Sequence, residues 1–249
     1  FLRLLVAAPL LGLLSLRLDR GKPWRWRRHD LIWWLLAMLS MGAYQLFIFA
    51  AVQRTTVTTA IALAICMSPV LVAFAAPLVL GERFSRRTLR AGALAIAGTA
   101  LVIGIGGAGD LVRTGYLLGN LLALAAAASW ATYVLMARHL VQHYSVTRIT
   151  SLTFAGATLM VLPLVLVQSQ PIVLPPLGWA LALYIGVIPT ALSYFLYVKG
   201  LAGTTATTAA FLTLAEPATA AILAAMLFDE RLSLLGWLGV VLLILGLID

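Results

Sequence analysis

Residues 55–85 read TTVTTAIALAICMSPVLVAFAAPLVLGERFS, and residues 204–233 read TTATTAAFLTLAEPATAAILAAMLFDERLS. Both stretches begin with Thr-Thr-x-Thr-Thr-Ala, continue through an apolar run that contains a proline, and end with Glu-Arg-x-Ser. A tyrosine precedes each stretch, Tyr44 in the first and Tyr194 in the second. Equivalent residues of the two copies are about 149 positions apart, with a shift of one residue along the alignment. The sequence therefore predicts two copies of one structural unit.

Long apolar runs fill most of the chain around these two stretches. Of its 249 residues, 63% are hydrophobic and 10% are charged, whereas soluble domains are about a quarter charged. The runs are roughly 17 to 25 residues long, which is the length of a helix that crosses a bilayer, and they lack the alternation of a barrel strand. We therefore predict an all-α membrane protein with about nine transmembrane helices, near residues 1–16, 31–52, 56–80, 89–106, 115–137, 147–168, 177–198, 204–228 and 233–248.

The first apolar run is short, and the chain opens with Phe1. A signal peptide is the competing interpretation of residues 1–16, but the basic cluster follows this run instead of preceding it, and a small-residue cleavage site is lacking. We expect an N-terminus that is incomplete, with an earlier segment missing.

The basic residues gather on one side when the helices are threaded alternately through the membrane. Thirteen positive charges fall on that side and three on the other, and the positive-inside rule makes the richer side, together with the C-terminus, cytoplasmic. The net charge of +9 is therefore a topology signal, and we predict no nucleic-acid partner. The thirteen are Arg17, Arg20, Lys22, Arg25, Arg27, Arg28, Arg83, Arg86, Arg87, Arg90, Arg138, Arg148 and Lys199.

The two copies are predicted to enter the membrane in opposite orientations. Five helices separate them, and an odd number reverses the direction of the second copy. The loop after Gly81 carries four arginines, whereas its counterpart after Asp229 carries one, as expected for a cytoplasmic and an external loop. Inverted repeats of this kind are a recurrent architecture of secondary transporters, whose substrate site lies near the midplane where the repeats meet.

These motifs resemble the EamA-type branch of the drug/metabolite transporter superfamily over essentially the whole chain. The residues that carry the resemblance are Ala50-Ala51-Val52, Thr55, Thr59, Ser68-Pro69, Gly81-Glu82-Arg83, Gly92, Gly98, Glu216-Pro217 and Asp229-Glu230-Arg231.

The resemblance implies a bundle of ten helices built as two inverted units of five. Residues 1–107 would form the first unit, with its first helix missing and four present, and residues 115–249 the second. It also implies an exporter or exchanger of small organic metabolites, such as amino acids or amphiphilic drugs, in the bacterial plasma (inner) membrane.

Glu216 is the acidic residue placed deepest within a predicted span. A carboxylate there costs a few kcal/mol or more unless it faces a cavity, finds a partner or holds a proton. We therefore predict contact with substrate or protons, and a structural role in a kink is the alternative. Pro69 and Pro217 occupy equivalent positions, where each would free a backbone carbonyl, so their helices are expected to line the pathway, with Ser68 beside the first break.

Aromatic and amide side chains complete the predicted pathway. Trp130 and Tyr133 lie too deep for interfacial anchors, and their rings would suit planar or cationic substrates, although core packing explains them equally well. Tyr44, Gln45 and Tyr194 are polar-tipped residues of the paired second and seventh spans, of which at least some should point inward.

Two other classes of protein remain as alternatives, a membrane-embedded enzyme and a non-transporting membrane scaffold. An enzyme would need a membrane constellation of His, Asp, Ser or metal ligands, and the sequence offers only Glu216 and isolated hydroxyl groups. His139 and His143 have the spacing of zinc ligands but lack the intervening glutamate and a third ligand. We predict a transporter without a catalytic residue, cofactor or metal. Its predicted partners are the lipid bilayer and a small-molecule substrate, and protons are a candidate third partner. The oligomeric state is left open.

Overall fold

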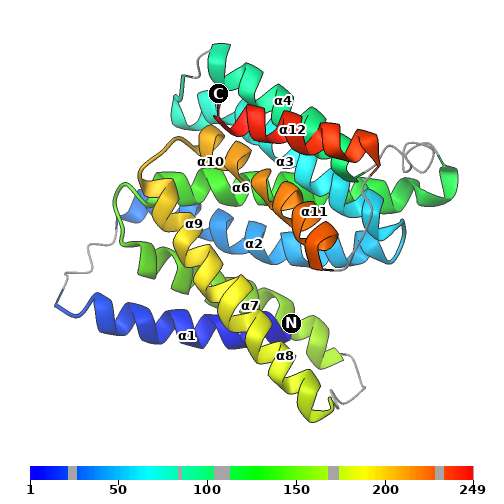
Figure 1. Cartoon of the computed structure of the whole chain (residues 1–249). Coiled ribbons are helices and arrows are strands. Elements are labelled where there is room, and N and C mark those ends of the chain that lie inside the picture. Colours follow the sequence, from blue (N-terminus) through cyan, green and yellow to red (C-terminus); the bar gives the residue numbers. More distant parts are fainter. Residues whose placement is uncertain (22–26, 84–85, 104–112, 168–173, 228–232, 249) are drawn as a thin grey trace. The chain divides into compact units, whose positions relative to one another are not determined.

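The computed structural model of the protein describes residues 1–21, 27–83, 86–103, 113–167, 174–227 and 233–248, and within these ranges all regular structure is helical (Figure 1). The elements, in chain order, are α1 (Leu2–Leu18), η1 (Arg28–Asp30), α2 (Leu31–Val52), α3 (Val57–Leu80), α4 (Arg86–Ile103), η3 (Thr114–Tyr116), α6 (Leu117–Leu140), α7 (Val146–Val167), α8 (Pro176–Gly186), η4 (Val187–Leu192), α9 (Ser193–Ala202), α10 (Ala206–Leu212), α11 (Ala215–Leu227) and α12 (Leu234–Ile248).

The protein is a multi-pass integral membrane protein. Six helical stretches in the described part of the chain are long and apolar enough to cross a membrane: Arg28–Val52, Val57–Leu80, Thr114–Leu140, Val146–Val167, Pro176–Ala202 and Ala206–Leu223. A shorter apolar helix spans Leu234–Leu247. The predicted all-α class is therefore confirmed. The predicted spans at α1 and α4 are helical but are not among these six, so the total of nine stays a prediction.

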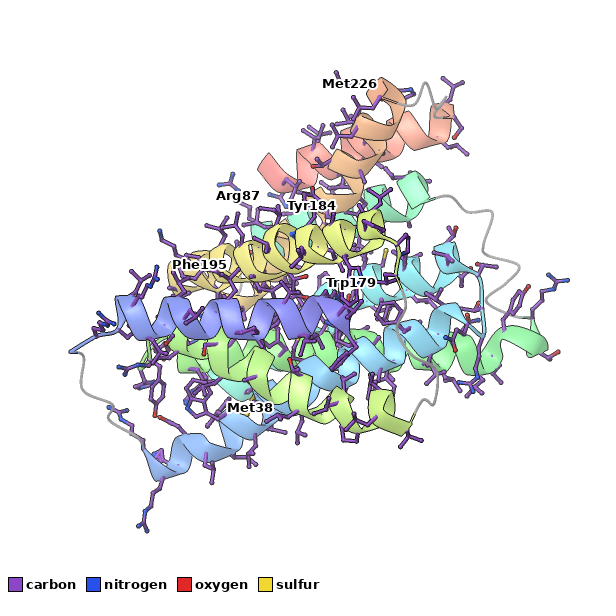
Figure 2. The ribbon with its side chains drawn as sticks, turned by 90° about the horizontal axis from the view of Figure 1, so that it is seen from below. Met38, Arg87, Trp179, Tyr184, Phe195 and Met226 are labelled. Carbon is purple, nitrogen blue, oxygen red and sulfur yellow. The ribbon has the colours of Figure 1, made fainter. Side chains whose placement is uncertain are left out.

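Large apolar side chains cover much of the surface. Trp179, Tyr184 and Met226, which are labelled in Figure 2, are exposed. Soluble proteins rarely expose contiguous apolar patches of large size. In a bilayer these side chains contact lipid.

The chain forms two compact units. The first contains residues 1–46 and 132–204, and the second contains residues 47–131 and 205–249, so that α2 and α6 each contribute to both. In the first unit α1 packs against α7, α8 and η4. The Thr158 hydroxyl donates to the Leu4 carbonyl near the start of α1 (3.4 Å), and the Ser145 hydroxyl donates to the Asp19 carboxylate at its other end (2.8 Å). Therefore α1 and α7 run antiparallel.

In the second unit α4 packs against α12, and the two lie side by side in Figure 1. Glycines allow this close approach, because a Cβ at Gly98 would lie 2.6 Å from the Gly239 carbonyl oxygen, and one at Gly246 would lie 2.6 Å from that of Ala91. As the residue number falls from 98 to 91 along α4, its neighbour on α12 rises from 239 to 246. These helices are therefore antiparallel as well.

Prolines act differently in the two copies. Helix α3 continues unbroken through Pro69 and Pro77, whereas the predicted span 204–228 is divided into α10 and α11 just before Pro217. The predicted span 177–198 also departs from a regular helix, because its centre around Pro189 forms the π-helical turn η4. Helix α3 is therefore continuous beside Ser68, whereas the second copy is interrupted before Pro217.

Candidate functional site

The break between α10 and α11 lies in the second unit and is produced by local hydrogen bonding. Pro217 has no N–H, so it cannot bond to the carbonyl of Thr213 four residues earlier. The backbone N–H of Glu216 donates to this carbonyl instead, at 3.1 Å, and Leu214 bonds in the same short register to Phe211 at 3.0 Å. Both bonds span three residues instead of the four of an α-helix, so the backbone forms a tighter turn at the break.

Glu216 lies on the exposed side of this break. Its neighbours Pro217 and Ala218 are buried, and Ala218 packs with Leu214 and Phe211 against helices α3, α4 and α12. Glu216 and Thr219, one turn later, are exposed. The fold thus directs the carboxylate away from the apolar core of the unit, where a charge would be costly.

Ser68 and Pro69 are buried in the same unit. The Ser68 hydroxyl donates to the Ala64 carbonyl at 2.5 Å and reaches the Ala127 carbonyl of α6 at 3.5 Å. Such a bond to the preceding turn occupies the hydroxyl and bends helices. Ser68 therefore joins α3 to α6. Trp130, also in this unit, is half-buried.

Three aromatic rings gather in the first unit. The ring of Tyr194 on α9 lies 4.8 Å from that of Phe154 on α7 in an edge-on arrangement, and 6.2 Å from that of Tyr133 on α6. Tyr133 and Phe154 are fully buried, whereas Tyr194 is half-buried. The structure therefore brings together two of the predicted residues, Tyr133 and Tyr194.

Gln45 is buried in the first unit and has a partner that the sequence analysis missed. The guanidinium of Arg3 on α1 donates to its side-chain oxygen, and its amide nitrogen lies 3.9 Å from the Met41 sulfur. Arg3 lies inside the first apolar run, and an arginine in such a run is itself a signal of an intramembrane partner. Tyr44, one residue before Gln45, is half-buried.

Two buried carboxylates at the ends of the first loop were also missed. Asp19 accepts hydrogen bonds from Ser145 and Thr147, and Arg148 lies 3.8 Å away. The partners of Asp19 lie more than 120 residues later in the chain, so the sequence could not identify them. The signal that the sequence did offer was the presence of acidic residues at the ends of a basic loop.

The second carboxylate, Asp30, contacts one of the paired histidines, His139. Asp30 accepts a hydrogen bond from the Tyr144 hydroxyl at 2.9 Å, and the His139 ring lies 3.5 Å from it. His139 stacks on Trp33 with a centroid distance of 3.8 Å. His139 therefore belongs to a polar and aromatic network with Asp30 and Trp33.

The comparisons with known proteins agree with this fold. An uncharacterized transporter of Bacillus subtilis, YwfM, is 34% identical over 99% of this chain and 81% of its own length. A second from that organism, YetK, is 26% identical over 99% of this chain and 75% of its own. A solved crystal structure matches 99% of this chain and 85% of its own at 20% identity, with a TM-score of 0.83, and shares its fold.

The match to the family covers almost all of the sequence in two segments, residues 1–104 and 117–248. This chain belongs to the EamA-like transporter family.

Proposed function

We propose that the protein is a secondary transporter that exports or exchanges small organic metabolites, such as amino acids or amphiphilic drugs, by alternating access, and that it has no catalytic activity. Membership in a transporter family and the transporter names of the relatives support a membrane transporter in general. The repeat architecture and the placement of Glu216 support the more specific mechanism.

The observation that carries this proposal is the antiparallel packing of equivalent helices. The sequence offset of about 149 residues pairs α1 with α7 and α4 with α12, and the members of both pairs run in opposite directions. Inverted repeats require this, whereas parallel repeats would point equivalent helices the same way. We therefore propose two inverted five-helix repeats, within residues 1–107 and 115–249, with nine helices in this chain.

Contacts between loops support the proposed grouping of the loops on two sides of the membrane. In the second unit Glu82 bonds to the start of α10, and both segments are assigned to the cytoplasmic side. Thr55 bonds to Asn120 at 3.0 Å, and both are assigned to the external side. The orientation with a cytoplasmic C-terminus, in a bacterial plasma membrane, is thus compatible with each of these contacts.

Glu216 is the proposed proton- or amine-binding residue of the pathway. It is exposed at the middle of an apolar segment, and a carboxylate in contact with lipid chains would be strongly disfavoured. A water-filled pathway relieves this cost. The helix break at Pro217 supports the same role, because irregular backbone at membrane depth is tolerated where it lines a cavity. Ser68, Pro69, Trp130, Tyr133, Tyr44, Gln45 and Tyr194 complete the proposed set of pathway residues.

Counterflow in proteoliposomes tests the function. Vesicles loaded with unlabelled amino acids, sugars or cationic drugs should accumulate the matching labelled compound for at least one class, in a pH-dependent manner. Glu216→Gln should abolish the pH dependence, whereas Glu82→Gln, which neutralises a carboxylate at a helix end, should retain it. Correctly inserted protein without counterflow in any class would contradict transport.

Cysteine labelling tests the inverted repeat separately. In a Cys66→Ser background, Arg87→Cys at the start of α4 and Leu234→Cys at the start of α12 should react with an impermeant maleimide from opposite sides of oriented membranes, because equivalent helix starts are inverted. Both positions are exposed. Labelling from the same side would rule out the inverted arrangement.

A further inference from the structure

A pocket of about 290 Å³ opens in the second unit, among α4, α10 and α12. Its wall is largely apolar, formed by Phe211 and Leu212 of α10, Ala91 of α4 and Leu247 of α12, while hydroxyl groups and one guanidinium lie at its polar part. The lining residues are Arg87, Thr88, Ala91, Thr208, Phe211, Leu212, Gly246 and Leu247.

Arginines of α4 lie at and near the polar end of this pocket. Arg87 projects outward from the first turn of α4, where Figure 2 labels it, and Arg86 and Arg90 are exposed on the same two turns. Helix α4 has no acidic residue in its first turn. An anion here would be attracted by the formal positive charge of this segment and by the helix dipole.

We propose that this pocket binds an anionic phospholipid from the leaflet that borders the basic loops. The phosphate would contact the Arg87 guanidinium, with the hydroxyls of Thr88 and Thr208 as further donors, and an acyl chain would lie along Phe211, Leu212 and Leu247. Basic pockets between transmembrane helices bind anionic lipid headgroups through this combination of charge and apolar contact.

The composition of the wall selects a lipid over a soluble phosphate compound. Leu212 is 51% exposed beside the pocket, and Leu89 on α4 is also exposed, so the opening is bordered by lipid-facing side chains. A soluble anion would leave the apolar wall without a partner, whereas a phospholipid satisfies the wall and the guanidinium together.

Native mass spectrometry of the delipidated full chain in detergent tests the proposal. Dioleoyl-phosphatidylglycerol, dioleoyl-phosphatidylcholine and inorganic phosphate are the three probes. Wild-type protein should retain one phosphatidylglycerol in preference to phosphatidylcholine. Arg87→Gln should weaken phosphatidylglycerol binding about tenfold, because it removes a charged hydrogen-bond donor in direct contact with the phosphate. Arg86→Gln is the matched control, because it removes the same charge from the same turn without lining the pocket, and it should weaken binding by less than about twofold.

The alternatives give different results. Equal losses in Arg86→Gln and Arg87→Gln would mean diffuse attraction to the basic surface and would overturn the site. Retention of phosphatidylcholine equal to that of phosphatidylglycerol would contradict a role for the headgroup charge and would overturn the proposal. Displacement of phosphatidylglycerol by millimolar inorganic phosphate would overturn the assignment of a lipid. Both variants alter exposed side chains, and unchanged thermal melting confirms that they fold.

Discussion

The carboxylate of Glu82, just beyond the C-terminus of α3, accepts a hydrogen bond of 2.8 Å from the backbone N–H of Ala206, the first residue of α10. The first N–H groups of a helix have no partner within the helix. Glu82 satisfies two of them, those of Ala206 and Thr207, with a charged acceptor that also favours the helix dipole. The first copy of the repeated Glu-Arg-x-Ser motif thus fixes the start of the helix that leads to Glu216.

Replacement of Glu82 should therefore destabilise the second unit. Glu82→Ala removes the charged acceptor and is expected to cost about 2 kcal/mol, which corresponds to a fall in melting temperature of roughly 5 °C. Glu82→Gln keeps a neutral acceptor and should have an intermediate effect. Thermal unfolding in detergent measures both. Arg83→Ala, one residue away at an exposed side chain, should leave the melting temperature within about 1 °C, and an equal fall in this control would contradict the capping role.

The contact between α4 and α12 predicts a steep cost for a single methyl group. A Cβ at Gly98 would lie 2.6 Å from both the Gly239 carbonyl oxygen and the Leu243 backbone nitrogen, and neither atom can move without shifting the helix. Gly98→Ala should cost about 1–3 kcal/mol through overpacking, measured by thermal unfolding.

The control for this effect is Gly12→Ala on α1, where a Cβ would meet nothing within 4 Å. This change should leave stability unchanged or raise it by up to about 1 kcal/mol, because glycine is unfavourable in a helix interior. A harmless Gly98→Ala would mean that α4 and α12 are farther apart than described.

The sequence predicted the helices well where local signals determine them. Helix α2 has the predicted bounds, and α3 starts one residue later than predicted because the Thr56 side chain caps it by accepting from the Thr59 N–H. A continuous apolar run with a capping threonine leaves few alternatives.

The different outcomes at the two prolines could not be predicted in the same way. Pro69 and Pro217 are equivalent in the sequence repeat, yet only the second follows a helix break. The difference arises from the residues that pack around each proline in the fold. Many of these are distant in the chain, so the local sequence does not reveal them. The pairing of Arg3 with Gln45 joins residues 42 positions apart, so it too required the fold.

Asp19 is predicted to hold the start of α7 through its buried carboxylate. Asp19→Asn should cost about 1–3 kcal/mol, because an amide accepts more weakly from Ser145 and Thr147 and loses the attraction of Arg148. Asp19→Ala should cost more, since it leaves these groups without an acceptor. Hydrogen exchange should rise at residues 145–149. The exposed Arg17→Ala is the control, and unaltered exchange in Asp19→Ala would show that α7 starts independently of this carboxylate.

Thr190 is predicted to compensate for the N–H that Pro189 lacks. In a regular helix the N–H of residue 189 would donate to the Ile185 carbonyl, and here the hydroxyl of Thr190, which is almost fully buried, donates to that oxygen at 2.7 Å. Thr190→Val should therefore remove the hydroxyl donor of the Ile185 carbonyl and cost about 1–3 kcal/mol in thermal unfolding. In a Pro189→Ala background the restored N–H can take the same carbonyl, so that Thr190→Val should cost much less. A double-mutant cycle measures this difference as a coupling energy. Equal costs of Thr190→Val in both backgrounds would mean that the hydroxyl stabilises the π-helical turn for a reason unrelated to the proline.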